Sequence, residues 1–209
     1  MRGRRIVAYR LGTGPAATRY LVLGGMHGDE PAGAQMVAGR LLAATPPPGV
    51  EVWVIPTMNP DGLARATRTN ARGVDLNRNF PSQDWLLQGR GTSTYSGPRA
   101  ASEPETRAML RFLDDVRPAT IVSLHQPLRC VDFSGGDPEV TYWLARHLGL
   151  PARQLGVSGG NMTGWYNRRF PQRTAVTLEL MQPAPVRFRN RLSEVLLDHA
   201  AARARQLTR

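Results

Sequence analysis

The first residues able to do chemistry are His27 and Glu30, which lie three positions apart in the segment Gly24–Glu30, Gly-Gly-Met-His-Gly-Asp-Glu. An apolar run precedes this segment and a helical pattern follows it, so both side chains can face one point at a strand-to-helix turn. Ligands of open α/β sheets bind at such strand ends, and imidazole and carboxylate groups are common zinc ligands. A histidine and a glutamate at this spacing are also common on protein surfaces, so the pair alone does not establish a metal site.

A catalytic zinc takes three protein ligands and keeps one position open for water, and the chain has three further histidines, His125, His147 and His199. His147 and His199 lie in helical stretches, where surface or packing roles are the simpler interpretation. His125 instead ends the apolar run Ile121–Leu124, again at the carboxyl end of a predicted strand. A set of His27, Glu30 and His125 would therefore make a sound open zinc site.

A second polar segment, Arg72–Pro81, offers groups that could support such a site. Asp75 could accept the second ring N–H of a ligand histidine and so fix the orientation of its ring. Asn77 and Arg78 carry an amide and a guanidinium fork, which suit a carboxylate. The alternative is a polar turn whose Asp and Asn side chains cap their own backbone.

A carboxylate in an apolar strand is the last candidate. Glu179 lies within the predicted strand Thr174–Leu180, where an unpaired buried carboxylate is costly. It therefore either lies at an exposed edge or has a function. Beside an activated water it would serve as a general base and then as the acid that protonates a leaving amine.

The elements that must position these residues alternate between strands and helices, which indicates an α/β fold with helices on both faces of the sheet. The predicted strands are Arg5–Tyr9, Tyr20–Leu23, Val50–Ile55, Thr120–Leu124 and Thr174–Leu180. The predicted helices are Pro31–Ala44, Glu103–Val116 with Ser102 as its N-cap, Pro138–Leu148 and Val186–Gln206. The loops Asn59–Gly73 and Phe80–Pro98 are too long to be simple connectors, so we expect them to be functional.

Composition narrows the class of protein. The chain has 209 residues, which favours a single domain spanning residues 1–209. It has no run of ~18 apolar residues and no signal-peptide pattern, and its one cysteine, Cys130, fits a reducing compartment. We expect a cytoplasmic protein that does not bind membranes.

The charge is unusual because all 27 basic residues are arginine, which gives a formal net charge of +11. The arginines are scattered along the chain, and no nucleic-acid-binding motif accompanies them, so we expect no nucleic-acid partner. A coding bias towards arginine is the simplest explanation. A positive field that attracts an anionic substrate is the functional alternative.

Together these motifs resemble the zinc metallocarboxypeptidase family. The matching elements occur in order over about residues 20 to 181: His27-x-x-Glu30, Asn59–Gly62, Asp75–Phe80, His125 and Glu179. The resemblance implies one mixed, twisted β-sheet flanked by helices, with one zinc ion per chain held by His27, Glu30 and His125. It further implies that Asn77 and Arg78 hold the terminal carboxylate of a peptide, that Glu179 is the general base, and that Arg68 polarises the scissile carbonyl, with Arg72 as a rival for that role.

Within this family the segment His125–Asp132 resembles the His-x-Pro-Leu-x-Cys-Val-Asp stretch of the murein peptide amidases. The segment Asn70–Pro81 is similar as well. This resemblance implies a cytoplasmic enzyme of cell-wall recycling that hydrolyses the γ-D-glutamyl–meso-diaminopimelate bond of a muropeptide. A homodimer is compatible with the sequence. For Cys130 we favour a small buried side chain over a redox or nucleophilic role.

The chain departs from its digestive-type relatives in two places. Where they carry a mobile tyrosine before a Ser-Gly-Gly stretch, this chain has Leu155, and Tyr166 is displaced in register. Where they build the pocket for the terminal side chain, this chain has polar Asn161 and Thr163. We hypothesise that these two residues bind the zwitterionic end of diaminopimelate.

Three alternatives differ in substrate or in kind. One is a zinc carboxypeptidase that acts on ordinary α-linked peptides. Another is an N-acyl amino acid deacylase resembling succinylglutamate desuccinylase or aspartoacylase. The third is a non-catalytic muropeptide-binding protein, which would have no need of a general base at Glu179.

Overall fold

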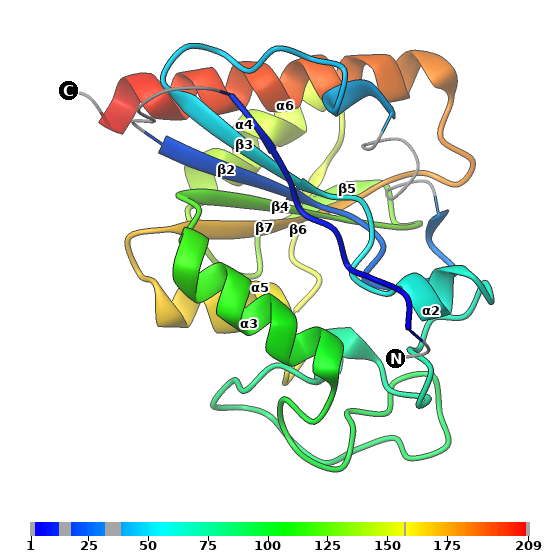
Figure 1. Ribbon diagram of the computed structural model, residues 1–209. Coiled ribbons are helices and arrows are strands. Elements are labelled where there is room, and N and C mark those ends of the chain that lie inside the picture. The colour runs from blue at the N-terminus through cyan, green and yellow to red at the C-terminus, as the bar shows by residue number, and fades with distance from the viewer. Residues whose placement is uncertain (1–2, 13–17, 32–38, 157, 208–209) are drawn as a thin grey trace.

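A mixed β-sheet forms the centre of the molecule (Figure 1). The computed structural model describes residues 3–12, 18–31, 39–156 and 158–207. Over these residues the sheet has seven strands in the order β1-β3-β2-β4-β7-β5-β6. The strands are β1 (Tyr9–Leu11), β2 (Thr18–Leu23), β3 (Val50–Ile55), β4 (Thr120–His125), β5 (Cys130–Asp132), β6 (Ala152–Arg153) and β7 (Thr174–Glu179). The four central strands β3, β2, β4 and β7 are parallel, whereas β1 and β5 join them antiparallel.

Helices cover both faces of the sheet, as the α/β pattern predicts. The described helices are α2 (Pro60–Leu63), α3 (Pro104–Val116), α4 (Pro138–Leu148), α5 (Met162–Arg169) and α6 (Val186–Leu207), with a 3₁₀ turn, η1, at Leu76–Arg78. Figure 1 shows α4 and α6 on one face and α3 and α5 on the other. Each pair closes its own apolar core against the sheet, centred on Val22 and Leu196 on one face and on Leu21 and Met109 on the other.

The four central strands confirm the sequence prediction, because their apolar runs are buried on both faces as parallel strands require. The prediction of a first strand at Arg5–Tyr9 is wrong. The strand is Tyr9–Leu11, which pairs with Val52–Val54 of β3, whereas Ile6 and Ala8 only pack against the second core. The apolar pattern indicated residues that pack against the core, but it did not indicate that the three residues Tyr9–Leu11 pair with β3.

The helices at Pro138–Leu148, Val186–Leu207 and Pro104–Val116 also follow the prediction closely. Residues 32–38 of the predicted helix Pro31–Ala44 lie outside the described part of the chain. The N-cap of α3 is Glu103 rather than Ser102, whose hydroxyl instead donates to the Glu103 carboxylate at 2.7 Å. The short elements β5, β6 and α5 were not predicted, since two to eight residues carry little periodicity.

Register brings the chemically interesting residues to one edge of the sheet. β4 ends at His125 and β7 at Glu179, and these two residues are direct partners in the parallel ladder. β2 ends at Leu23, shortly before His27. Because these strands are parallel, their carboxyl ends lie at the same edge, which is where open α/β sheets bind ligands.

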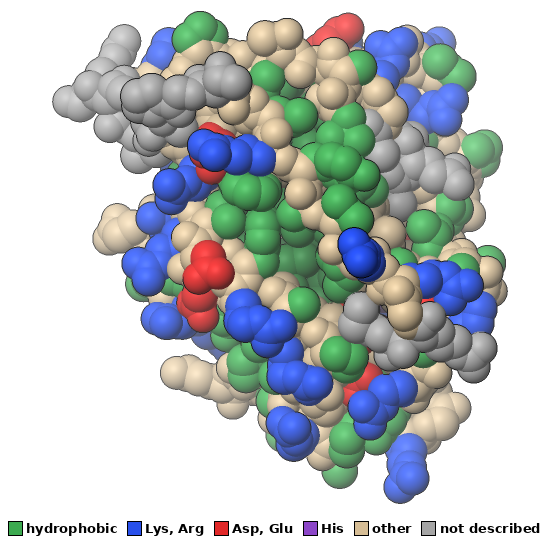
Figure 2. Space-filling model, viewed as in Figure 1, with side chains coloured by type: hydrophobic (Ala, Val, Ile, Leu, Met, Phe, Trp, Pro, Cys, Tyr) green, Lys and Arg blue, Asp and Glu red, His purple; other side chains and the backbone are tan. Residues whose placement is uncertain are grey.

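The surface view shows arginine side chains spread over the visible face, with few acidic groups among them (Figure 2). None of the described helices combines the length and apolar character that a membrane span needs.

Candidate active site

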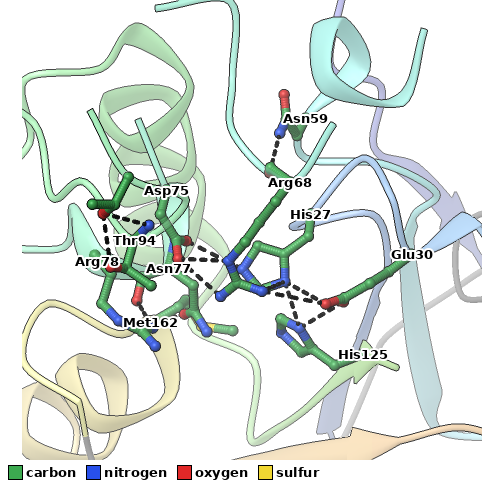
Figure 3. Close-up of polar contacts among 11 residues, drawn as sticks. His27, Glu30, Asn59, Arg68, Asp75, Asn77, Arg78, Thr94, His125 and Met162 are labelled. Carbon is green, nitrogen blue, oxygen red and sulfur yellow. Dashed lines mark hydrogen bonds and ion pairs between the residues drawn. The ribbon is translucent and has the colours of Figure 1, made fainter. Parts of the chain in front are cut away.

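The three predicted metal ligands converge at the carboxyl edge of the sheet. His27 and Glu30 come from the turn after β2, and His125 is the last residue of β4. His27 Nδ1 lies 2.7 Å from Glu30 Oε1, and His125 Nδ1 lies 3.0 Å from Glu30 Oε2. All three side chains are buried, and their ligand atoms lie within 4.8 Å of one another. Figure 3 shows the two rings and the carboxylate turned towards a common point.

This donor set fits a zinc ion. Two imidazole nitrogens and one carboxylate make the ligand set of an open catalytic zinc site. Burial by itself would raise the pKa of Glu30, but hydrogen bonds from His125 and His27 lower it to about 2. The carboxylate is therefore ionised at neutral pH, which is the form that binds a metal.

Asp75 links three parts of the site from a fully buried position. Its Oδ1 lies 3.1 Å from His27 Nε2, which is the outer-shell contact that the sequence suggested. The same oxygen accepts from the Asn77 backbone N–H at 2.9 Å and so caps η1. Its Oδ2 accepts two hydrogen bonds from Arg68. Burial opposes ionisation, but the contacts with His27 and the charge of Arg68 hold the pKa of Asp75 well below its usual range.

The Asn59–Gly62 motif explains how the Arg68 loop is held. Asn59 caps α2 by accepting from the Gly62 N–H, and its amide group donates to the Arg68 carbonyl at 3.2 Å. The turn that carries the metal ligands packs directly on this motif, since a Cβ at Gly28 would collide with the backbone of Gly62. The absence of a side chain at Gly28 therefore allows this close approach.

The structure separates the two arginine candidates. The Arg68 Nη1 lies 3.6 Å from Glu30 Oε1, and its side chain lines the main cleft beside the metal ligands. Arg72 faces a different cavity and approaches the carboxylate of Glu103. Arg68 is thus the arginine placed to contact a carbonyl bound at the metal site.

Asn77 and Arg78 line the same cleft from η1. The side-chain Oδ1 of Asn77 accepts from the Met162 backbone N–H at 3.0 Å, which leaves the side-chain NH₂ group of Asn77 for a ligand. One Arg78 guanidinium nitrogen, Nη1, donates to the Asn77 backbone carbonyl at 2.8 Å. Burial lowers the pKa of Arg78, which remains a cation at neutral pH. The two donors stand side by side, as carboxylate binding requires.

Glu179 ends β7 beside His125 and is 8% exposed. Its Oε2 accepts from the Leu128 backbone N–H at 3.3 Å. Burial raises the pKa of Glu179 above its ordinary value, which brings the group closer to the range where a general base works. The alternative that Glu179 lies on an exposed edge strand is wrong, because β7 lies between β4 and β5 within the sheet.

The cleft of about 360 Å³ continues from the metal ligands towards α5 and β7. Its polar lining includes residues that the sequence analysis gave no role: Asp132, Ser134, Asn167 and Thr177. Thr177 could have been predicted from the sequence, because alternate residues of a strand share a face and Thr177 lies two positions before Glu179. Of the others, Asp132 ends the unpredicted strand β5, Ser134 lies in the loop that follows it, and Asn167 lies in the unpredicted helix α5.

Asn161 and Thr163 line this cleft, but their side chains also serve the local backbone. Asn161 is the N-cap of α5 and accepts from the Gly164 N–H at 2.6 Å, while its NH₂ group donates to the Ser158 carbonyl. The Thr163 hydroxyl donates to the Asn161 side chain. Their role in binding diaminopimelate stays a prediction.

The remaining residues of interest fall outside the site or at its rim. Tyr166 is fully buried and donates to the Pro118 carbonyl, so it does not reach the cleft. Leu155 lines the cleft where relatives were expected to carry tyrosine. His199 is buried near β2, and His147 stacks on Trp143. Cys130 is buried with no disulfide among the described residues.

Comparison with known proteins identifies relatives of this chain. The model of the family described as zinc carboxypeptidase matches residues 1–131. Murein peptide amidase A of Escherichia coli K12 is 37% identical over 153 residues, covering 66% of this chain and 61% of that protein. The Vibrio campbellii protein of the same name is 34% identical over 181 residues, covering 78% and 69%. The chain thus spans about three fifths of the length of the Escherichia coli relative.

Solved structures show the same fold. A murein-tripeptide amidase from Escherichia coli O157 superposes with a TM-score of 0.76 at 27% identity, covering 98% of this chain and 88% of that one. Bovine thrombin-activatable fibrinolysis inhibitor reaches the same TM-score at 18% identity, covering 97% and 86%, which shows the fold alone. With the family model matching more than half of its length, the chain belongs to the zinc carboxypeptidase family.

Proposed function

We propose that this protein is a zinc-dependent amidase that releases the carboxyl-terminal residue of a small peptide. The observation that carries the proposal is the pairing of His125 with Glu179 in the sheet, which sets a buried carboxylate beside the metal ligands. A binding protein would have no use for such a group. When bound by His27, Glu30 and His125, zinc would supply Lewis-acid activation of water and of the scissile carbonyl.

The chain's own residues would then perform the proton transfers. Glu179 takes a proton from the attacking water and later delivers it to the nitrogen of the leaving amine. The Leu128 N–H holds one carboxylate oxygen of Glu179, so the other can face the substrate. The C–N bond breaks as that proton arrives, giving a carboxylate and an amine.

Two further groups position the substrate. Arg68, held by Asp75, directs its remaining N–H groups at the negative charge that develops on the carbonyl oxygen. Asn77 and Arg78 bind the terminal carboxylate of the leaving residue. The side chain of that residue would occupy the polar end of the cleft, near Asn161 and Thr163.

For the substrate we infer the γ-D-glutamyl–meso-diaminopimelate bond of a murein tripeptide, in cytoplasmic recycling of the cell wall. Support comes from the names of the relatives that match at 34–37% identity. The polar cleft also suits an amino acid with a second charged end better than an apolar one. The residues of the site come from one sheet and from the segments at its carboxyl edge, which supports a single catalytic domain.

The test is incubation of the zinc-loaded protein with L-Ala-γ-D-Glu-meso-diaminopimelate, followed by mass spectrometry. We expect release of diaminopimelate. Glu179→Gln should lower kcat by roughly 10² to 10⁴-fold with zinc content unchanged, whereas Glu194→Gln, an exposed carboxylate on α6, should leave kcat unchanged.

An α-linked dipeptide and an N-acyl amino acid run in parallel. Cleavage of either, without cleavage of the tripeptide, would keep the zinc mechanism and reject the murein substrate. No cleavage of any of the three by protein with one zinc per chain would favour the non-catalytic alternative.

A further inference from the structure

A second cavity, of about 900 Å³, lies next to the active-site cleft. Arg68 lines both spaces, so the two meet at this side chain. Asp29, which precedes the ligand Glu30, also lines the second cavity. The cavity is therefore reached from the metal site on the side of Arg68, whereas Asn77 and Arg78 line only the first cleft.

This arrangement separates the two halves of a bound substrate. If Asn77 and Arg78 hold the carboxylate of the leaving residue, that residue fills the first cleft. The acyl half must leave the metal site in another direction, and the second cavity provides the space. A γ-linked glutamyl residue brings a charge there, because its α-carboxylate stays free when the amide bond is made through its γ-carboxyl group.

Arg72 and Arg90 are the cations available for that charge. Arg68 already donates to Asp75 through Nε and Nη2, and its remaining N–H groups face the scissile carbonyl in the proposed mechanism. The Arg72 side chain is 57% exposed, and only its Nε approaches a carboxylate, at 3.6 Å from Glu103 Oε2. Its guanidinium makes no hydrogen bond to the described residues. Arg90, on the long loop across the cavity, forms neither a hydrogen bond nor an ion pair with them.

Local structure holds Arg72 in place for such a ligand. The Arg72 N–H donates to the Asn70 side chain at 2.9 Å, and the following Gly73 N–H donates to the Asn70 carbonyl. Asn70 is itself buried and donates to Glu103 at 2.8 Å. An arginine whose backbone is held in this way loses less freedom when its guanidinium binds a carboxylate.

The acidic residues of the second cavity do not prevent Arg72 and Arg90 from binding an anion. Glu103 is fully buried and already accepts from Asn70 and Ser102. Asp29 is exposed and lies at the side of the metal ligand Glu30. Its charge complements the ammonium group of the residue that precedes glutamate, so the cavity offers both signs of charge that an alanyl-glutamyl unit carries.

We propose that Arg72 and Arg90 form an anion subsite that binds the free α-carboxylate of a γ-linked glutamyl residue. This subsite would select γ-linked substrates over peptides with a neutral acyl half. The inference rests on the proposed function and adds the residues that recognise the acyl half of the substrate.

The test compares two substrates that differ in one group: L-Ala-γ-D-Glu-meso-diaminopimelate and its analogue with the glutamyl α-carboxylate converted to the carboxamide. We expect the wild-type protein to prefer the carboxylate by on the order of 10-fold in kcat/KM, as a charge-assisted contact provides. Arg72→Gln with Arg90→Gln should abolish this preference through KM while leaving kinetics on the carboxamide unchanged. The unchanged carboxamide reaction also shows that the variant is folded.

Arg111→Gln is the matched control, because Arg111 is exposed on α3 outside both cavities. Equal cleavage of the two substrates by the wild type, or a preference that survives in the double variant, would overturn the subsite and leave the amidase intact. An equal loss on both substrates would also overturn it. Cleavage of neither substrate by the wild type would reject the proposed function, and the subsite with it.

Discussion

His27 and His199 are almost equally buried, at 3% and 2% exposure, yet their surroundings are opposite in character. His27 lies between the carboxylates of Glu30 and Asp75, with a second histidine and Arg68 beside it. His199 lies against the aromatic rings of Tyr20 and Trp143, and its Nδ1 lies within hydrogen-bonding distance of the Tyr20 hydroxyl, at 2.9 Å. One histidine belongs to a polar cluster and the other to the packing between α4, α6 and the sheet.

The pKa values show what the neighbours decide. Burial alone would lower the pKa of His27, but its contacts with Asp75 and Glu30 raise it. Burial lowers the pKa of His199 to about 3, and the nearby Arg203 and His147 add to this effect. Depth therefore does not identify a functional histidine. A neighbouring carboxylate does identify a functional histidine, because a carboxylate can bind the same metal ion as the histidine and an aromatic ring cannot.

The largest expected contrast lies between the two kinds of histidine. His125→Ala removes a ligand and should abolish stoichiometric zinc binding and lower hydrolysis by roughly 10⁴-fold. His147→Ala should leave both zinc content and specific activity near those of the wild type. Metal analysis of the purified variants and initial-rate assays check the contrast. A His125→Ala protein that keeps one zinc per chain would refute the ligand assignment.

A smaller effect is expected from the partner of His27. Asp75→Asn keeps the shape but weakens the orientation of the His27 ring and the hold on Arg68. We expect zinc affinity to fall by roughly 10 to 100-fold, measured by competition with a chelator. Asp198→Asn, at an exposed carboxylate on α6, is the control. Equal affinities in the two variants would show that the Asp75 contact does not support the metal.

A third effect concerns the stability of the fold rather than metal binding, and it is acid sensitivity at His199. Its pKa is about 3 in the folded state and near 6.5 when unfolded, so the unfolded chain binds more protons between these values. This contribution to stability is complete above about pH 6.5 and is lost as the pH falls towards 3. The loss is at most about 1.4 kcal/mol per pH unit.

Urea unfolding of the wild type and of His199→Gln at several pH values gives the free energy of unfolding of each protein. The difference between their slopes against pH measures this loss. The subtraction removes the contributions of the titrating groups that the two proteins share. Parallel slopes for the two proteins would show that the burial of His199 does not govern acid stability.

Much of the site could be predicted from residue types and spacing alone. His27, Glu30 and His125 were candidates because each follows an apolar run that forms a strand, and strand ends of one parallel sheet meet at one edge. Asp75 was a candidate partner for a ligand histidine. These inferences needed only local pattern and the chemistry of each side chain.

The tertiary structure decided what depends on contacts between distant segments. The sequence could not distinguish Arg68 from Arg72, because the two arginines lie only four positions apart in one loop. The folded loop places Arg68 beside Glu30 and Arg72 beside Glu103. It also could not show that Asn161 caps α5, nor that Asp132, Ser134 and Asn167 line the cleft.

The sequence by itself determined which groups could bind a metal, move a proton or hold a carboxylate, because these abilities belong to single side chains. The pairing of His125 with Glu179 and the position of Arg72 in a second cavity were decided only by the fold. Strand register and loop packing depend on the burial of apolar surface over the whole sheet, and no local pattern records that balance.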